Sequence, residues 1–117
     1  MSYPDNTITE TVTIAAGASL SGASTKYAGY KLVAVVTAST WDAAKIAFQV
    51  SNDGTNFFVL KPKGTEYECA AVTGAAAVAI EPQYFVGFDY VKVQSGISTA
   101  ATNQADATIV TLVFMPL

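Results

Sequence analysis

Apolar and polar residues alternate with a period of two along most of this chain, in short runs interrupted by turn-forming residues. The clearest run covers residues 7–14 (TITETVTI), where Ile8, Val12 and Ile14 fall on one side and threonines on the other. A period of two places successive side chains on opposite faces of a strand, whereas a helix requires a period of 3.6. The pattern therefore predicts a chain built from β-strands, each with one face in a hydrophobic core.

Similar runs recur and are separated by clusters of Gly, Pro, Asn, Asp and Ser. We expect strands over residues 7–14, 30–37, 45–51, 57–60, 66–72, 75–80, 90–95 and 108–115. Short strands spaced by about 8–12 residues are typical of β-sandwiches and jelly rolls. The predicted fold class is therefore all-β, an antiparallel β-sandwich of jelly-roll-like type with about eight strands. The length of 117 residues suits one domain, which we place at residues 7–117, after a flexible N-terminal arm of residues 1–6.

The segments between the strands are less regular. Residues 40–48 are rich in alanine and could start a helix at a Thr40 cap. However, Ile46 and Phe48 continue the period of two, so we expect a loop and then a strand, with Ala47 facing outward. The other connections include an expected helical turn over residues 83–88 and a polar loop over residues 96–107.

The composition excludes several kinds of chemistry. Charged residues make up 13% of the chain, about half of the ~25% usual in soluble domains. There is no histidine, no arginine and one cysteine, Cys69. Without histidine, a Ser-His-Asp or Cys-His nucleophile system cannot form, and a typical zinc site lacks its ligands. We therefore expect no enzymatic activity, no cofactor and no metal, but a chain that binds or builds.

Two clusters of oxygen-bearing side chains could suggest chemistry. Residues 52–56 (NDGTN) could suit calcium, but no acidic ligand completes a calcium loop, and Asp53-Gly54 is a strong hairpin signal. Glu66 and Glu68 lie two residues apart on one strand face, about 7 Å, a separation that could suit a glycosidase. Because any outward strand face has this spacing, we interpret the first cluster as a turn and the second as solvated surface.

The charge and hydropathy patterns exclude other partners. A net charge of −3 and six scattered lysines argue against binding to a nucleic-acid backbone. The apolar stretches are far shorter than the ~18–20 residues that cross a membrane. The first residues carry no basic segment typical of a signal peptide. We therefore expect no nucleic acid and no membrane as partners, and a soluble product of the cytoplasm or one assembled there.

Aromatic residues are the main candidates for contacts with a partner. Consecutive Phe57 and Phe58 must point to opposite faces of a strand, so one of them lies away from the face that the other fills. An exposed ring can stack on a sugar or anchor a protein partner; alternatively, all of these rings fill the core. The candidate partner contacts are Tyr3, Pro4, Trp41, Phe57, Phe58, Tyr84 and Phe85.

A set of short motifs covers roughly residues 33–113. It comprises Trp41-x-x-Ala44-x-Ile46-x-Phe48-Gln49-x-Ser51-x-Asp53-Gly54-x-x-Phe57, then Phe85-x-Gly87, Val91-Lys92-Val93-x-Ser95-Gly96 and Gln104-Ala105-Asp106. Together these motifs resemble small virion proteins that tailed bacteriophages and phage-like elements encode among their head and tail structural genes. One departure is Gln94, where an arginine is expected, so the resemblance implies no charged contact there.

The resemblance implies a structural role in a virion, most directly as a capsid decoration or cement protein. Its implied partners are the major capsid protein and copies of itself, as a dimer or trimer, and its implied location is the virion, assembled in the host cytoplasm. The low charge agrees, because the cores of protein interfaces are depleted in charge. The alternative is a carbohydrate- or receptor-binding module of a head fibre or tail tip, with Trp41 and one of Phe57 and Phe58 stacking on a glycan.

Overall fold

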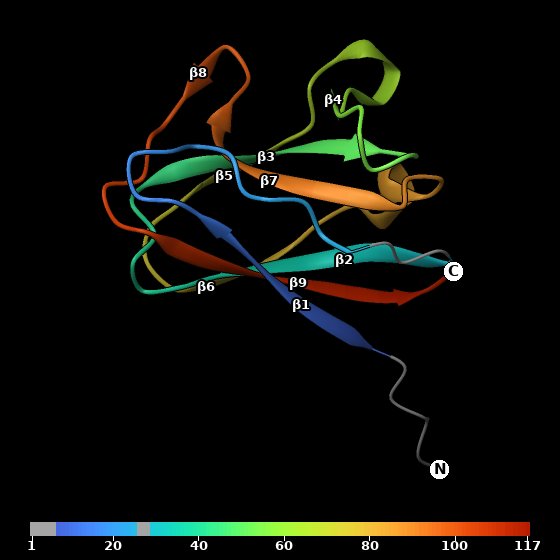
Figure 1. Cartoon of the computed structure of the whole chain (residues 1–117), viewed down its shortest axis with the longest axis horizontal. Coiled ribbons are helices and arrows are strands. Elements are labelled where there is room, and N and C mark those ends of the chain that lie inside the picture. Colours follow the sequence, from blue (N-terminus) through green and yellow to red (C-terminus); the bar gives the residue numbers. More distant parts are fainter. Residues whose placement is uncertain (1–6, 26–28) are drawn as a thin grey trace.

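Two antiparallel β-sheets lie face to face in the computed structural model, which describes residues 7–25 and 29–117 (Figure 1). The strands of the described chain are β1 (Ile8–Ile14), β2 (Tyr30–Thr37), β3 (Ala44–Ser51), β4 (Phe58–Val59), β5 (Glu68–Val72), β6 (Ala76–Ala79), β7 (Tyr90–Ile97), β8 (Ala100–Ala101) and β9 (Thr108–Pro116). Two short 3-10 helices, η1 (Pro62–Gly64) and η2 (Pro82–Phe85), lie in the connections. The predicted all-β, sandwich-like fold is confirmed.

The first sheet has the strand order β1-β9-β2-β6, and the second has β4-β3-β7-β8, with β5 also paired to β3. They form the lower and upper layers in Figure 1. The first sheet joins the two ends of the described chain, because β1 pairs with β9 from Ile8 opposite Phe114 to Ile14 opposite Thr108. Since β9 also pairs with β2, it is an interior strand. The first sheet therefore needs segments from both ends of the chain.

Alternate residues of the strands fill the space between the sheets. In β9, Val110, Leu112 and Phe114 are buried, whereas Ile109 and Met115 on the other face are exposed. This alternation explains why the period of two marked the core correctly. The buried side chains that form one continuous core are Val12, Ile14, Leu32, Val35, Trp41, Ala44, Ile46, Phe48, Val50, Leu60, Ile80, Phe85, Val91, Val93, Val110, Leu112 and Phe114.

Two details of the strands differ from the expectation. Ala47 is fully buried rather than facing solvent. Its neighbours across the sheet are Glu68 in β5 and Gln94 in β7, whose longer side chains flank it on the same face. In addition, the described residues form nine strands rather than about eight. The extra strand, β8, pairs with Gly96 and Ile97 inside the segment that was expected to be a loop, and a strand of two residues is too short to show a period.

The edge of β7 opposite β3 is completed by residues 19–24. The backbone N–H groups of Ser21 and Ser24 donate to the carbonyl oxygens of Val93 and Val91, at 2.9 Å each. In return, the Val93 N–H donates to Ser21 Oγ at 2.9 Å and the Val91 N–H donates to Ser24 Oγ at 3.0 Å. Serine hydroxyls thus take the place that strand carbonyls would have, and both serines are buried.

Gln104 joins several loops at the end of β7 that lies away from Tyr90. Its side chain is fully buried, and its Nε2 donates to Ser95 Oγ at 2.8 Å. Its backbone N–H donates to the Ala18 carbonyl oxygen at 2.9 Å, and its carbonyl oxygen accepts from the Gly17 N–H at 2.7 Å. A buried polar side chain is costly unless its groups are hydrogen-bonded, so Gln104 ties these loops to the second sheet.

Candidate functional site

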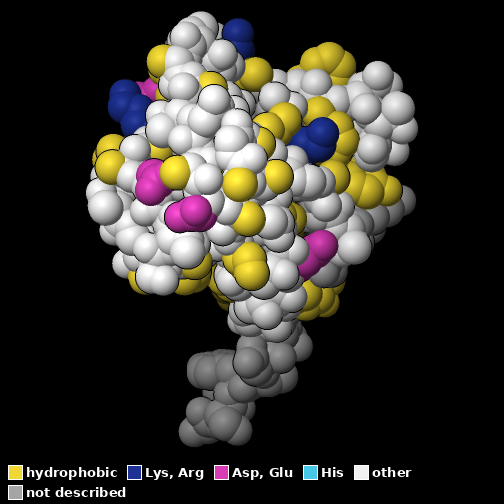
Figure 2. Space-filling view, turned by 60° about the vertical axis from the view of Figure 1, so that its left-hand side comes forward, with side chains coloured by type: hydrophobic (Ala, Val, Ile, Leu, Met, Phe, Trp, Pro, Cys, Tyr) yellow, Lys and Arg dark blue, Asp and Glu magenta, His cyan; other side chains and the backbone are white. Residues whose placement is uncertain are grey.

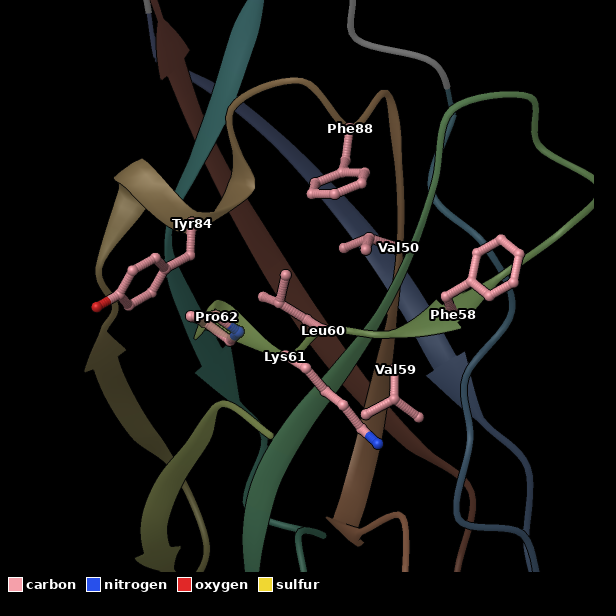
Figure 3. Close-up of a pocket in the computed structure, with 8 residues that line it drawn as sticks. All are labelled: Val50, Phe58, Val59, Leu60, Lys61, Pro62, Tyr84 and Phe88. Atoms are coloured by element: carbon pink, nitrogen blue, oxygen red, sulfur yellow. The ribbon is translucent and has the colours of Figure 1, made fainter. Parts of the chain in front are cut away.

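An apolar groove lies at the end of the second sheet where β3 ends and β7 begins. It has a volume of about 330 Å³ and is lined by Val50, Phe58, Val59, Leu60, Lys61, Pro62, Tyr84 and Phe88 (Figure 3). A second hollow of about 430 Å³ adjoins it and shares Val50, Phe58 and Phe88. Its other lining residues are polar: Ser51, Asn52, Asp53 and Asn56. We call the two hollows together the Phe58 groove; it has an apolar half and a polar half.

The hairpin between β3 and β4 forms one wall of the Phe58 groove. Val50 lies opposite Phe58, and Gln49 lies opposite Val59. The chain continues beside β3 after β4 ends, because the Leu60 N–H donates to the Phe48 carbonyl oxygen at 3.0 Å. Pro62 then begins η1 and turns the chain away. The strand, its extension and the proline together contribute five consecutive residues, 58–62, to this wall.

Asp53 holds the turn of this hairpin in place. Its Oδ1 accepts from the N–H groups of Thr55 at 2.8 Å and Asn56 at 2.9 Å, and from Ser51 Oγ at 2.9 Å. Its Oδ2 accepts from Asn56 Nδ2 at 2.9 Å. These hydrogen bonds, led by the two backbone N–H groups, hold the pKa of the Asp53 carboxyl well below its ordinary value. The interpretation of residues 52–56 as a hairpin turn is therefore confirmed.

Phe58 is the most exposed aromatic residue of the groove, with 69% of its surface accessible. Phe57 is half-buried and points the other way, toward Lys92, whose Nζ lies 4.3 Å from the centroid of its ring. A lysine ammonium over an aromatic face is a favourable cation–π contact. The prediction that the two rings take opposite faces is confirmed, and Phe58 is the ring left open to solvent.

Tyr84 forms the opposite wall, from η2. Its ring meets Tyr67 edge to face, with ring centroids 5.4 Å apart, and Tyr67 packs against Phe48 and Phe85 in the core. Figure 3 shows the Tyr84 hydroxyl pointing away from the other groove residues. The nearby Glu81 carboxylate raises the pKa of Tyr84 above its ordinary value. The groove wall is thus an outward continuation of the aromatic core.

Two of the predicted partner contacts are wrong, because Trp41 and Phe85 are core residues with 2% and 1% of their surfaces exposed. Trp41 lies just before β3, where its backbone N–H donates to the Ala38 carbonyl oxygen and its carbonyl oxygen accepts from the Gly74 N–H, at 3.0 Å each. Phe85 ends η2 with its ring edge-on to Phe48, at a centroid distance of 5.0 Å. Aromatic residues in connections can close the ends of a sandwich core, and sequence alone does not separate this role from an exposed one.

The other predicted contacts have different outcomes. Phe58 and Tyr84 both line the Phe58 groove, whereas Phe57 lines neither half of it and its ring faces Lys92. Tyr3 and Pro4 lie outside the described residues, as does the expected arm of residues 1–6. The predicted set did not include Phe88, which lines both halves of the groove. In the sequence, the feature that marks Phe88 is the preceding Gly87. In the structure Gly87 has a φ of 96°, a conformation that glycine adopts readily, and it forms the turn before β7.

Glu66 and Glu68, the two glutamates considered as a carboxylate pair, each contact a different neighbour on the surface of the second sheet. Glu66 accepts hydrogen bonds from the N–H and Oγ of Ser98, with distances of 2.7–3.2 Å. Glu68 forms an ion pair with Lys45 at 2.9 Å. Within residues 7–25 and 29–117, no group of three or more His, Cys, Asp or Glu residues is placed to hold a metal ion. The cysteine is half-buried, and burial raises the pKa of the Cys69 thiol, which lowers its reactivity.

The outer face of the first sheet is a second candidate surface. Cross-strand neighbours on this face form two rows, Thr9–Val113–Ala34–Ala79 and Thr11–Thr111–Val36–Ala77, with the pairs Thr13–Ile109 and Lys31–Met115 at its ends. Lys31 is the charged residue of this set. In Figure 1 no described element lies on the far side of this sheet. On another side of the molecule, Figure 2 shows acidic and basic side chains at separate places among uncharged ones.

Among the described residues, no helix has the length and apolar character needed to cross a membrane.

Searches against protein-family models, curated proteins and solved structures gave no match to this chain.

Proposed function

We propose that the protein is a structural component of a tailed-phage virion, a decoration or cement protein that attaches to the major capsid protein through the Phe58 groove. The observation that carries the proposal is the exposed Phe58 ring beside an apolar groove. Anchor residues of protein interfaces are typically aromatic and sit in or beside such pockets. The motifs that resemble small virion proteins supply the choice of partner.

The energy of attachment favours Phe58 as the anchor. Fully burying a phenylalanine side chain contributes about 1.5–3 kcal/mol, and most of this ring is accessible to a partner. The wall residues Val59 and Pro62 add apolar surface around it, while Lys61 supplies a charge at the margin. A central aromatic residue with a more polar margin is the usual anatomy of an interface.

Binding rather than catalysis fits the side chains available. The chain has no histidine or arginine. Asp53, Glu66 and Glu68 are engaged in hydrogen bonds or an ion pair that shape their own loops. A general base or nucleophile needs a partner that activates it, and these groups act instead as structural acceptors.

The test is attachment to particles from the source genome. Purified particles should contain the protein by mass spectrometry, and particles lacking it should bind the purified protein in co-sedimentation. Phe58→Asp should abolish co-sedimentation, because the exchange removes the anchor and places a charge in the groove. Ala100→Asp is the matched control, since it adds the same charge to an exposed site on β8, away from the groove. The proposal is wrong if the protein is absent from the particles, or if Phe58→Asp binds as well as Ala100→Asp does.

A second candidate function is glycan binding, favoured by the polar half of the groove. Asn52 and Asn56 lie beside Phe58 there, and sugars are commonly held by an aromatic face together with amide hydrogen bonds. Phe58 replaces Trp41 as the stacking residue, because Trp41 is buried. A glycan array followed by titration calorimetry tests this. A glycan bound by the wild type and lost in Phe58→Ala supports it, and an array without binding removes it.

A further inference from the structure

We propose that a second copy of this chain packs face to face on the outer face of the first sheet. This inference goes beyond the proposed function, because it concerns the free protein and a surface that the Phe58 groove does not include. It rests on three properties of the face: its side chains, its area and the position of its charge.

The side chains of this face are small and uncharged over its whole middle. The two central rows contain threonine, valine and alanine, contributed by all four strands of the sheet. Ile109 and Met115 lie at opposite ends of β9 and are 50% and 45% exposed. Short side chains of similar size allow two sheets to pack about 10 Å apart, the usual separation of stacked sheets.

The area of the face suits a weak dimer. Its strands β1, β9, β2 and β6 contain seven, nine, eight and four residues. With strands ~4.8 Å apart and ~3.3 Å per residue, they cover roughly 450 Å². Two copies therefore bury about 900 Å² together, slightly less than the ~1,000 Å² of a stable specific interface. The area predicts a transient dimer that dissociates at micromolar concentrations rather than an obligate one.

The position of the Lys31 ammonium group on this face determines how the two copies are oriented. Lys31 lies opposite Met115, at one end of the face. A twofold axis lying in the interface along the strands would bring the two Lys31 ends together. An axis across the strands places them at opposite ends of the interface, where each ammonium stays in water. Because like charges in contact disfavour association, the second arrangement is the one we infer, with Thr111 and Val113 of the two copies meeting near the axis.

The test is the association of the purified protein, measured by sedimentation equilibrium between about 1 and 200 μM. The wild type should form dimers with a dissociation constant of about 1–100 μM. Thr111→Arg should raise that constant at least ~100-fold, because it puts a charge on each copy near the axis. Thr99→Arg, an exposed threonine in the turn between β7 and β8, is the matched control and should dimerise as the wild type does. Circular dichroism should show that each variant is folded.

Thr11→Arg is the second variant, needed if Thr111→Arg does not fold. Thr11 lies opposite Thr111 on the edge strand β1 and is exposed, so its replacement disturbs the sheet less. A mixture of Thr111→Arg and Thr111→Glu should form a mixed dimer, because the opposite charges then meet near the axis. Failure of the mixture to associate would overturn the orientation.

The proposal as a whole is overturned by a wild type that stays monomeric up to 200 μM. It is equally overturned by folded Thr111→Arg or Thr11→Arg proteins that associate as tightly as the wild type, since association then uses another surface, such as the β1 edge. Failure here leaves attachment to capsids unaffected, because that experiment depends on particles and on Phe58.

Discussion

The side-chain amide of Gln104 pairs with the backbone of Asp42 through two hydrogen bonds. The Asp42 N–H donates to Gln104 Oε1 at 2.7 Å, and Gln104 Nε2 donates to the Asp42 carbonyl oxygen at 3.2 Å. The side-chain amide thus forms the same pair of hydrogen bonds with the Asp42 backbone that a residue of a neighbouring strand would form. The Asp42 carboxylate returns the contact, since its Oδ2 accepts from the Ala105 N–H at 2.8 Å. Two loops 62 residues apart in sequence are joined at this point.

Replacing Gln104 should destabilise the fold strongly. Gln104→Leu keeps a similar volume but leaves the Asp42 N–H and carbonyl groups and the Ser95 hydroxyl without this partner, at an expected cost of about 2–4 kcal/mol in the free energy of unfolding. Gln83→Leu is the control, because Gln83 is exposed and should change that free energy by less than about 0.5 kcal/mol. Urea denaturation measures both. A loss below about 1 kcal/mol for Gln104→Leu would show that the buried amide is not needed.

The serines beside β7 should control the protection of two amides. Ser21→Ala should expose the Val93 N–H to exchange, and Ser24→Ala should do the same for Val91, because each loses its hydroxyl acceptor. Each of the two substitutions should also lower the free energy of unfolding by about 1–2 kcal/mol. Ser39→Ala, at an exposed position before β3, should change neither quantity. Hydrogen–deuterium exchange followed by NMR tests this residue by residue; an unchanged Val93 amide in Ser21→Ala would contradict the assignment.

Three glycines should tolerate alanine to different degrees. Gly17, Gly54 and Gly96 all have φ near 80°, so alanine strains each backbone by about 1–2 kcal/mol. An added Cβ meets nothing within 4 Å at Gly17, lies 2.9 Å from the Tyr90 ring at Gly54, and lies 2.6 Å from backbone atoms at Gly96. A ring can shift more easily than a paired backbone can. The loss in the free energy of unfolding should therefore be largest for Gly96→Ala, intermediate for Gly54→Ala and smallest for Gly17→Ala. Thermal and urea denaturation measure it, and any other order would contradict this account.

Asp53 should make the protein sensitive to acid. Because hydrogen bonds lower the pKa of its carboxyl in the folded state, it stabilises the fold above the ordinary value of 3.8, and this contribution is lost as the pH falls below that value. Asp53→Asn keeps an acceptor oxygen but does not titrate. The urea midpoint should therefore fall less between pH 5 and pH 2 in the variant than in the wild type. Identical slopes, or an Asp53 carboxyl that titrates at its ordinary pKa by NMR, would refute the prediction.

The strands were predictable because their information is local. The alternation in residues 7–14 and 45–51 marked which side chains face the core, and the Asp53-Gly54 pair marked the hairpin. The strand order was not predictable, since nothing in residues 8–14 indicates that they pair with the far end of the chain. The motifs and the period of two carry no information about such long-range pairing.

The candidate site was predictable only in part. Phe58 followed from the rule that neighbouring strand residues take opposite faces, and it is exposed as that rule allows. Trp41 and Phe85 were misplaced because they lie in connections, where no period determines which way a ring points. Gln104 could not be foreseen either, since its role depends on two loops meeting in space, and in the sequence it is an ordinary polar residue of a loop.

The pairing of the first strand with the last also determines when the fold can be completed. Residues 44–101 contain every strand of the second sheet, so the pairing of that sheet does not depend on β1 or β9. β1 leaves the ribosome early but waits for β9, and at about 5–20 residues per second the delay is roughly 5–20 s. During that interval β1 is an unpaired, threonine-rich strand, the kind of segment that chaperones shield from aggregation. β2 and β6 can pair without β9, but β1 has β9 as its strand partner, so the first sheet is completed only once β9 has emerged.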